Sequence, residues 1–146
     1  MNDSAVHPQT PVALLLLGVA HEVEARLEAA LGQAGLSLAK FNVLSRLVEA
    51  GEPLPLGALA DRCSCVRSNM TQLIDRLEAD RLVERVSDPS DRRSIRASLT
   101  GEGRSRHAEG AEILDVAQGE VFARLGEAER ATLTRLVQQL RREPCS

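Results

Sequence analysis

The feature that most constrains the fold is a pair of short amphipathic patterns that lie only a few residues apart. Both patterns repeat apolar side chains at the spacing i, i+3, i+4 and i+7, which places them on one face of a helix. The members are Leu56, Leu59, Ala60 and Cys63 in the first pattern, and Met70, Leu73, Ile74 and Leu77 in the second. Residues 64–66 between the two helices leave room only for a tight turn, so the stretch predicts a helix-turn-helix.

The next segment, RLVERVSDPSDRRSIRASLT at residues 81–100, changes from helical spacing to alternation. Ile95, Ala97 and Leu99 alternate with polar residues, as in a half-buried strand. The Ser-Asp-Pro-Ser-Asp run at 87–91 has the composition of a turn. The pattern predicts a β-hairpin with a basic tip, and a helix-turn-helix followed by a hairpin is a winged helix.

Long helical patterns flank this winged segment. Apolar residues recur every four positions from residue 12 to residue 32, which predicts a first helix. Ser37 is placed to cap a second helix that ends at Gly51. Thr100 is placed to cap a helix of residues 101–125, and a last helix follows Gly126.

The predicted fold class is mainly α with a small β-hairpin wing, that is, a winged helix-turn-helix plus a helical dimerisation region. The expected divisions are a flexible N-terminal arm (1–11), a helical dimerisation region (12–34 and 100–146) and a winged helix-turn-helix DNA-binding region (37–99). A chain of 146 residues forms about one domain, and its terminal helices carry more apolar surface than such a domain covers internally. The sequence therefore predicts a homodimer.

The charge distribution favours the middle of the chain as the site of a nucleic-acid contact. The whole chain carries a net charge of −3, but residues 61–106 hold ten Arg against eight Asp or Glu. Phe41 and Phe122 are the only aromatic residues apart from histidine, which disfavours stacking on single-stranded bases. Duplex recognition does not need aromatic side chains, so double-stranded DNA is the expected partner.

The second helix and the hairpin tip carry side chains suited to duplex DNA. In the major groove Arg pairs with guanine, Asn and Gln pair with adenine, and Ser or Thr reaches phosphates or bases. The outward residues of this helix are Arg67, Ser68, Asn69, Thr71, Gln72 and Arg76. Arg92 and Arg93 at the tip are suited to a narrow minor groove. We predict that these residues contact DNA, although an ordinary solvated helix face has a similar composition.

The segment LADRCSCVRSNMTQLIDRLEADRLVERVSDPSDRRSIRASLTGEGR, residues 59–104, resembles the DNA-binding core of the MarR family of bacterial transcription regulators. The resemblance rests on LIDRLEADRLVER and DPSDRRSIRASLTGEG at the family's spacing, and LSLAKFNVLSRL fits the family's second helix. It implies a repressor that binds a palindromic operator as a symmetric homodimer and is released by an effector. It also implies that Arg93 enters the minor groove and that Asp91 supports the wing through a salt bridge to Arg76.

The chain departs from the family in the turn of the helix-turn-helix. Relatives usually have a leucine, a glycine, a small apolar residue and a capping hydroxyl where this chain has Cys63, Ser64, Cys65 and Val66. Val66 cannot cap the second helix, so Ser64 or the main chain must do so.

The two cysteines of the turn admit three interpretations. In the plainest, Cys63 is a small apolar residue of its helix and Cys65 fills the turn. Alternatively, Cys65 is a redox switch, because Arg62, Arg67 and a helix N-terminus could depress its pKa. A disulfide between positions i and i+2 would be strained. The third interpretation is a soft-metal site that uses both cysteines and Cys145.

The effector is expected to be an unknown small molecule or oxidant, and His21, Lys40 and Arg46 could line its cleft. An odd number of cysteines without a signal peptide predicts a cytoplasmic protein. The apolar run at 12–20 is too short to cross a membrane, so no membrane partner is expected.

Two other classes of function compete with DNA binding. An enzyme is disfavoured because the sequence has no Gly-rich phosphate loop, no cluster with metal-ligand spacing and no evident pairing of nucleophile and base. We therefore expect no catalytic residues, no cofactor and no metal centre. A winged helix used only for protein contacts is the other rival, and it would not need Arg92 and Arg93 at the tip.

Overall fold

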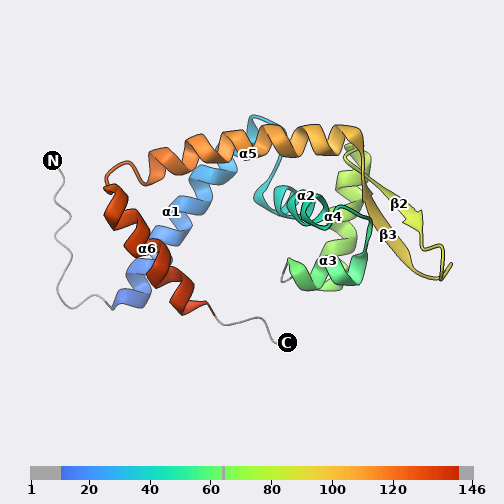
Figure 1. Ribbon diagram of the computed structural model, residues 1–146, viewed down its shortest axis with the longest axis horizontal. Helices are drawn as coiled ribbons and strands as arrows, with labels where there is room; N and C mark the ends of the chain where they lie inside the picture. Colours follow the sequence, from blue (N-terminus) through green and yellow to red (C-terminus); the bar gives the residue numbers. More distant parts are fainter. Residues whose placement is uncertain (1–10, 64, 142–146) are drawn as a thin grey trace.

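The computed structural model describes residues 11–63 and 65–141, and Figure 1 shows their arrangement. The elements are α1 (Val12–Gly32), α2 (Leu38–Ala50), β1 (Leu54–Pro55), α3 (Leu56–Arg62), α4 (Arg67–Ala79), β2 (Val83–Ser87), β3 (Ile95–Leu99), α5 (Gly101–Val121) and α6 (Glu127–Leu140). Helix α5 runs along the molecule, with α1 and α6 at one end and α2, α3, α4 and the hairpin at the other. The mainly α fold with a small β wing is confirmed. All but residue 11 of the predicted arm lies outside the described residues.

Three helix-end signals in the sequence operate as expected. The hydroxyl of Ser37 accepts a hydrogen bond from the Lys40 main-chain N–H at 3.1 Å, which starts α2. Gly51 ends α2 in the left-handed conformation with φ of 67°, where a side chain would be strained. The hydroxyl of Thr100 accepts from the Gly103 N–H at 2.9 Å and starts α5.

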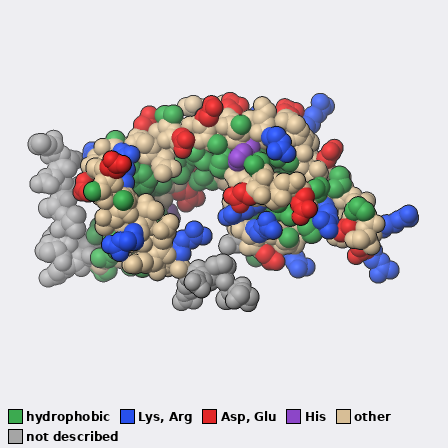
Figure 2. Space-filling model, viewed as in Figure 1, with side chains coloured by type: hydrophobic (Ala, Val, Ile, Leu, Met, Phe, Trp, Pro, Cys, Tyr) green, Lys and Arg blue, Asp and Glu red, His purple; other side chains and the backbone are tan. Residues whose placement is uncertain are grey.

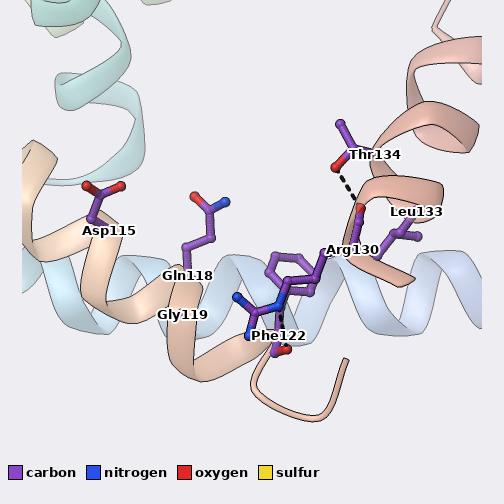
Figure 3. Close-up of a pocket in the computed structure, with 7 residues that line it drawn as sticks. All are labelled: Asp115, Gln118, Gly119, Phe122, Arg130, Leu133 and Thr134. Carbon is purple, nitrogen blue, oxygen red and sulfur yellow. Dashed lines mark hydrogen bonds between the residues drawn. The ribbon is translucent and has the colours of Figure 1, made fainter. Parts of the chain in front are cut away.

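Helix α5 ends at Val121, before the predicted end at residue 125. A pocket of about 220 Å³ lies where the chain turns from α5 into α6 (Figure 3). Arg130 of α6 lines this pocket, and its Nε donates to the carbonyls of Phe122 and Leu125 at 3.2 Å each. Carbonyls released at a helix end need such partners, so this arginine stabilises the early turn.

The sheet has three strands in the order β1-β3-β2, all antiparallel. The predicted hairpin is formed by β2 and β3, which pair Val83 with Leu99 and Ser87 with Ile95. The strand β1 was not predicted from the sequence, and its Leu54 pairs with Ala97 of β3. The proline of β1 suits an edge position, because an edge strand can lack one row of main-chain donors.

The core lies in the winged half, where α2, α3, α4 and the sheet bury their apolar faces together. Helix α5 joins this core through close contact at two glycines. A Cβ added at Gly103 would collide with the Leu82 carbonyl oxygen, and one at Gly110 would lie 3.0 Å from side-chain atoms of Leu36 and Phe41. The main chain of α5 therefore packs directly against the start of β2 and against α2.

The opposite end of the molecule leaves apolar surface open. The large apolar side chains exposed on α1 and α6 are Val12, Leu14, Leu15, Leu16, Leu17, Val19, Leu133, Leu136, Val137 and Leu140. In the single chain every residue of α6 is at least partly exposed. A helix of the length and apolarity needed to cross a bilayer is absent from the described part of the chain.

Candidate nucleic-acid interface

Helix α4 is the second helix of the helix-turn-helix, and burial fixes which of its faces is free. Met70, Ile74 and Leu77 are fully buried in the core. The six side chains predicted to contact DNA are all exposed: Arg67, Ser68, Asn69, Thr71, Gln72 and Arg76. The hydroxyl of Thr71 donates to the Arg67 carbonyl oxygen at 3.1 Å and keeps its acceptor lone pairs available. The face predicted from spacing is thus presented as one polar surface.

The hairpin tip is a compact turn organised by Asp88, whose side chain is buried in the wing. Its carboxylate accepts hydrogen bonds from the main-chain N–H and the hydroxyl of Ser90 at 2.9 and 2.8 Å, and from Arg96 Nη2 at 2.8 Å. These hydrogen bonds, the Ser90 N–H first, lower the pKa of Asp88 to about 2. Arg92 and Arg93 follow the turn and are both exposed. Figure 2 shows basic side chains gathered at this end of the molecule.

The wing is joined to α4 by Arg85 of β2. Its Nη2 pairs with Asp75 Oδ1 at 2.5 Å, and its Nη1 pairs with Glu78 Oε1 at 3.0 Å. Its main-chain N–H also donates to Glu78 Oε2 at 3.0 Å. The two neighbouring carboxylates raise the pKa of Arg85, the hydrogen bond to Asp75 contributing most. Two acids of α4 are therefore paired with a cation of the wing.

The salt bridge that the resemblance implied between Asp91 and Arg76 is not formed in the single chain. Asp91 Oδ1 instead accepts from the Arg93 main-chain N–H at 3.0 Å, so its carboxylate orders the tip itself. Arg76 is exposed in the last turn of α4 and forms no ion pair within the described residues. Asp91 therefore stabilises the turn at the tip of the wing, whereas Arg85 connects the wing to α4.

Val66, at the N-cap position of α4, provides no side-chain cap, as the sequence predicts. Main-chain hydrogen bonds hold the turn instead: the Cys65 N–H donates to the Ala60 carbonyl at 2.8 Å, and the Met70 N–H donates to the Val66 carbonyl at 3.0 Å. Ser64, the alternative cap, lies outside the described residues.

Cys63 and Cys65 are both half-buried, and neither forms a disulfide within the described residues. Burial raises the pKa of the Cys63 thiol, and the nearby Arg46 guanidinium opposes that rise in part. The Cys65 thiol donates to the Val66 carbonyl oxygen at 3.4 Å. Both side chains line one hollow between α2 and the start of α4. Cys145 lies outside the described residues, so its predicted part in a metal site stays a prediction.

Of the three residues predicted to line an effector cleft, Lys40 and Arg46 are both engaged in ion pairs. Lys40 Nζ pairs with Asp80 at 2.7 Å, which ties α2 to the end of α4, and Arg46 pairs with Glu49 at 3.2 Å. His21 is exposed on α1.

A polar group that was not predicted from the sequence, His107 of α5, lies where α5 packs against α2. Its ring stacks on Phe41 with centroids 5.0 Å apart, and its Nε2 lies 3.0 Å from the Ser45 hydroxyl. Burial lowers the pKa of His107, and Glu49 opposes this effect. The spacing of Gly103 and Gly110 marks the face of α5 that packs closely, and His107 lies between them on that face.

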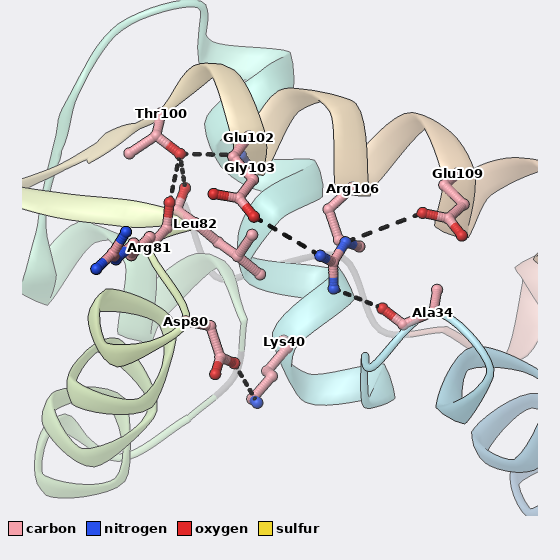
Figure 4. A network of polar contacts seen from close by, with 10 residues as sticks. All are labelled: Ala34, Lys40, Asp80, Arg81, Leu82, Thr100, Glu102, Gly103, Arg106 and Glu109. Atoms are coloured by element: carbon pink, nitrogen blue, oxygen red, sulfur yellow. Dashed lines mark hydrogen bonds and ion pairs between the residues drawn. The ribbon is translucent and has the colours of Figure 1, made fainter.

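A polar network around the first turns of α5 links the winged half to the α1–α2 loop (Figure 4). The Thr100 hydroxyl shares its proton between the carbonyls of Arg81 and Leu82 at 2.8 and 3.0 Å. Arg106 Nη1 donates to the Ala34 carbonyl at 2.8 Å, and its Nε lies 3.9 Å from Glu109 Oε2. The same helix therefore contacts the chain just after the helix-turn-helix and the chain just after α1.

Comparisons with known proteins agree with this geometry. The sequence profile of the MarR family matches residues 34–94. The uncharacterized HTH-type transcriptional regulator YsmB of Bacillus subtilis is 40% identical over 73 residues, which span 50% of this chain and 49% of that relative. The chain thus spans about half the length of YsmB in this alignment. The HTH-type transcriptional repressor Rv2887 of Mycobacterium tuberculosis is 28% identical over 130 residues, covering 89% of this chain and 93% of the repressor.

Among solved structures, Bordetella bronchiseptica BpsR superposes with a TM-score of 0.81 at 25% identity, covering 92% of this chain and 95% of BpsR. BpsR is a protein whose DNA binding is regulated by 6-hydroxynicotinic acid. The family profile covers the helix-turn-helix and most of the wing, and the structural match extends over the flanking helices. The family profile, the relatives and the superposed structure therefore support a MarR-family transcription regulator, and the chain has the winged-helix fold of that family.

Proposed function

We propose that the chain is a homodimeric repressor that binds a palindromic operator and leaves it when an effector binds. The observation that carries the proposal is the joint presentation of two DNA-reading elements: the exposed polar face of α4 and the wing arginines, held together through Arg85. In the major groove, the exposed residues of α4 would contact base edges or phosphates: Arg67, Ser68, Asn69, Thr71, Gln72 and Arg76. Arg92 and Arg93 would enter the flanking minor groove.

The dimer is supported by the apolar side chains left open on α1 and α6. Patches of this kind on a water-exposed surface mark interaction sites. The helical region, residues 12–34 and 100–146, would pair with a second copy, and residues 37–99 would face DNA. A two-fold dimer presents its two recognition helices to half-sites about 34–36 Å apart, which matches a palindrome.

Repression and release are supported by the relatives. Rv2887 is a repressor, and a small molecule regulates DNA binding by BpsR. In this chain α5 contacts both the winged half and α1, so a ligand at their junction would change the position of the recognition helices. Binding to DNA is the property to measure first, because release has meaning only for a protein that binds.

Fluorescence anisotropy with duplex DNA from upstream of the protein's own gene tests the proposal. We expect binding that weakens steeply with added salt, because phosphate contacts release counterions. Arg93→Ala should cost about 1–3 kcal/mol of binding free energy without changing the oligomeric state. Arg135→Ala is the matched control and should bind normally, because this exposed arginine lies on α6, at the other end of the molecule from the wing.

Absence of binding at low salt would reject the operator-binding proposal and favour the protein-contact alternative. An Arg93→Ala variant with full affinity would reject the assignment of the wing to the minor groove.

A further inference from the structure

Three sulfur-bearing side chains line a single hollow at the start of the recognition helix α4. The hollow measures about 400 Å³ and lies between α2 and the helix-turn-helix. Cys63 and Cys65 border it from the turn, and Met70 borders it from the first turns of α4. The remaining lining residues are Ala39, Asn42, Val66, Asn69 and Leu73, none of which carries a charge.

This set of donors is selective in its chemistry. Thiolates and thioethers are soft ligands that favour monovalent copper, whereas calcium and magnesium require oxygen ligands. Structural zinc takes four ligands from Cys, His, Asp and Glu, and no cluster of three or more such residues exists within the described ranges. Two thiols and one thioether thus suit a soft cation of low coordination number.

We propose that Cys63, Cys65 and Met70 form a site for a soft monovalent d¹⁰ cation such as Cu(I), and that occupation of this site weakens operator binding. The regulatory half of this inference rests on the function proposed above, while the binding half does not. On binding, two S–H bonds break, two metal–thiolate bonds form, and two protons pass to solvent, with no change of oxidation state. The Met70 thioether would donate a lone pair without losing a proton.

The position of the hollow explains the expected effect on DNA. Val66 and Asn69 line it, and Arg67 and Ser68, two of the predicted DNA-contact residues, lie between them in sequence. Within the described residues the turn is held by main-chain hydrogen bonds and has no side-chain cap, so drawing Cys63 and Cys65 onto one ion would shift the start of α4. Two thiolates with one monovalent cation also carry one negative charge more than two thiols. That charge would face the phosphates of bound DNA.

The binding half is tested with Ag(I), a redox-inert probe for soft monovalent cations, added to the reduced full-length protein after reductant is removed under nitrogen. Native mass spectrometry should show a single tightly bound Ag(I) per chain. Cys63→Ser or Cys65→Ser should weaken binding by more than the roughly 10–100-fold typical of an outer-shell change. Cys145→Ser distinguishes this site from one completed by Cys145, and it should keep the parent affinity. Zn(II) should not displace Ag(I).

Folding of each variant is checked by circular dichroism, and Cys63→Ala replaces the serine variant if the latter unfolds. Met70→Leu nearly conserves volume in the core and should fold, yet it should bind Ag(I) more weakly than the parent. Unchanged affinity in both turn-cysteine variants, or a loss seen only in Cys145→Ser, would overturn the site.

The regulatory half is tested by anisotropy with operator DNA in the same samples. Ag(I) should reduce operator affinity of the parent and of Cys145→Ser at least tenfold, and should leave the Cys63→Ser/Cys65→Ser double variant unaffected. If Ag(I) binds at this site but operator affinity does not change, the regulatory half is wrong. If the metal-free parent does not bind DNA, the proposed function is wrong. The mass spectra would still show whether Cys63, Cys65 and Met70 bind Ag(I).

Discussion

At the scale of single residues, Asp88 is the side chain on which the order of the wing tip depends. Its carboxylate joins Ser90 to Arg96, so it closes the turn and fixes it to β3. Asp88→Asn would keep the shape but lose the charge that strengthens these hydrogen bonds. We expect faster hydrogen exchange in the tip and weaker operator binding, with the core unchanged. Normal exchange at residues 88–94 in this variant would contradict the assignment.

The same carboxylate makes a defined contribution to the pH dependence of stability. Its pKa is about 2 in the folded chain against 3.8 ordinarily. A depressed pKa stabilises the folded state above pH 3.8, and this contribution is lost as the pH falls from 3.8 towards 2. Urea unfolding at a series of pH values should show a smaller acid-induced loss in Asp88→Asn than in the parent. Identical pH profiles for the two proteins would contradict this contribution of Asp88.

Gly103 tests how closely α5 approaches the winged half. Gly103→Ala would drive a Cβ into the Leu82 carbonyl oxygen, so the helix must shift away from β2. We expect a loss of about 1–3 kcal/mol in the free energy of unfolding, as for other overpacked sites. Gly101→Ala in the same turn meets no atom within 4 Å and is the control. Equal stability of the two variants in chemical denaturation would refute the close contact.

At the scale of elements, Arg85 couples the wing to the recognition helix. Arg85→Ala would leave Asp75 and Glu78 unpaired near bound DNA, and we expect weaker operator binding. The partly exposed ion pairs themselves contribute only about 0–1 kcal/mol to stability, so the fold should survive. Adding Asp75→Asn to Arg85→Ala removes one unpaired charge and should restore part of the affinity.

This double-mutant cycle separates electrostatics from simple loss of structure. If Asp75→Asn gives no recovery in the Arg85→Ala background at low salt, repulsion by the unpaired carboxylates is not the cause. Thermal unfolding of Arg85→Ala, of Asp75→Asn alone and of the double variant supplies the stability comparison.

At the scale of the whole molecule, the open apolar faces of α1 and α6 predict association of two copies. Leu136→Glu places a charge among exposed apolar residues of α6 and should convert a dimer to monomers. Ala131→Glu adds the same charge to an exposed position elsewhere on α6 and should leave the dimer intact. Sedimentation velocity measures both. Monomers in the parent protein, or dimers in both variants at low concentration, would rule out this interface.

The sequence predicted features that depend on near neighbours better than features that depend on distant ones. The caps at Ser37 and Thr100 and the turn at Gly51 follow from residues within one turn of helix, and all three are confirmed. The free face of α4 follows from the spacing of Met70 and its neighbours. These features can be predicted because the spacing of apolar residues along the chain indicates a helix and its buried face.

Pairings between distant residues are not accessible in the same way. Nothing in a single sequence shows that α4 and the wing are joined by Asp75 and Arg85 rather than by Arg76 and Asp91, and the second pair, which the resemblance implied, is not formed within the described residues. Lys40 was named as a residue that could line an effector cleft, and the sequence did not indicate its ion pair with Asp80, 40 positions away. The strand β1 was missed because two residues are too few to show an alternation.

The close packing of α5 also has a mechanical consequence. This helix of 21 residues is about 30 Å long, and it contacts the winged half at its first turns and α1 farther along. A tilt of about 5° at one end would move the other by roughly 2–3 Å over that length. In the proposed dimer, helix α5 would therefore act as a lever, and an effector would need to change only its angle to move the two recognition helices away from the spacing of the half-sites.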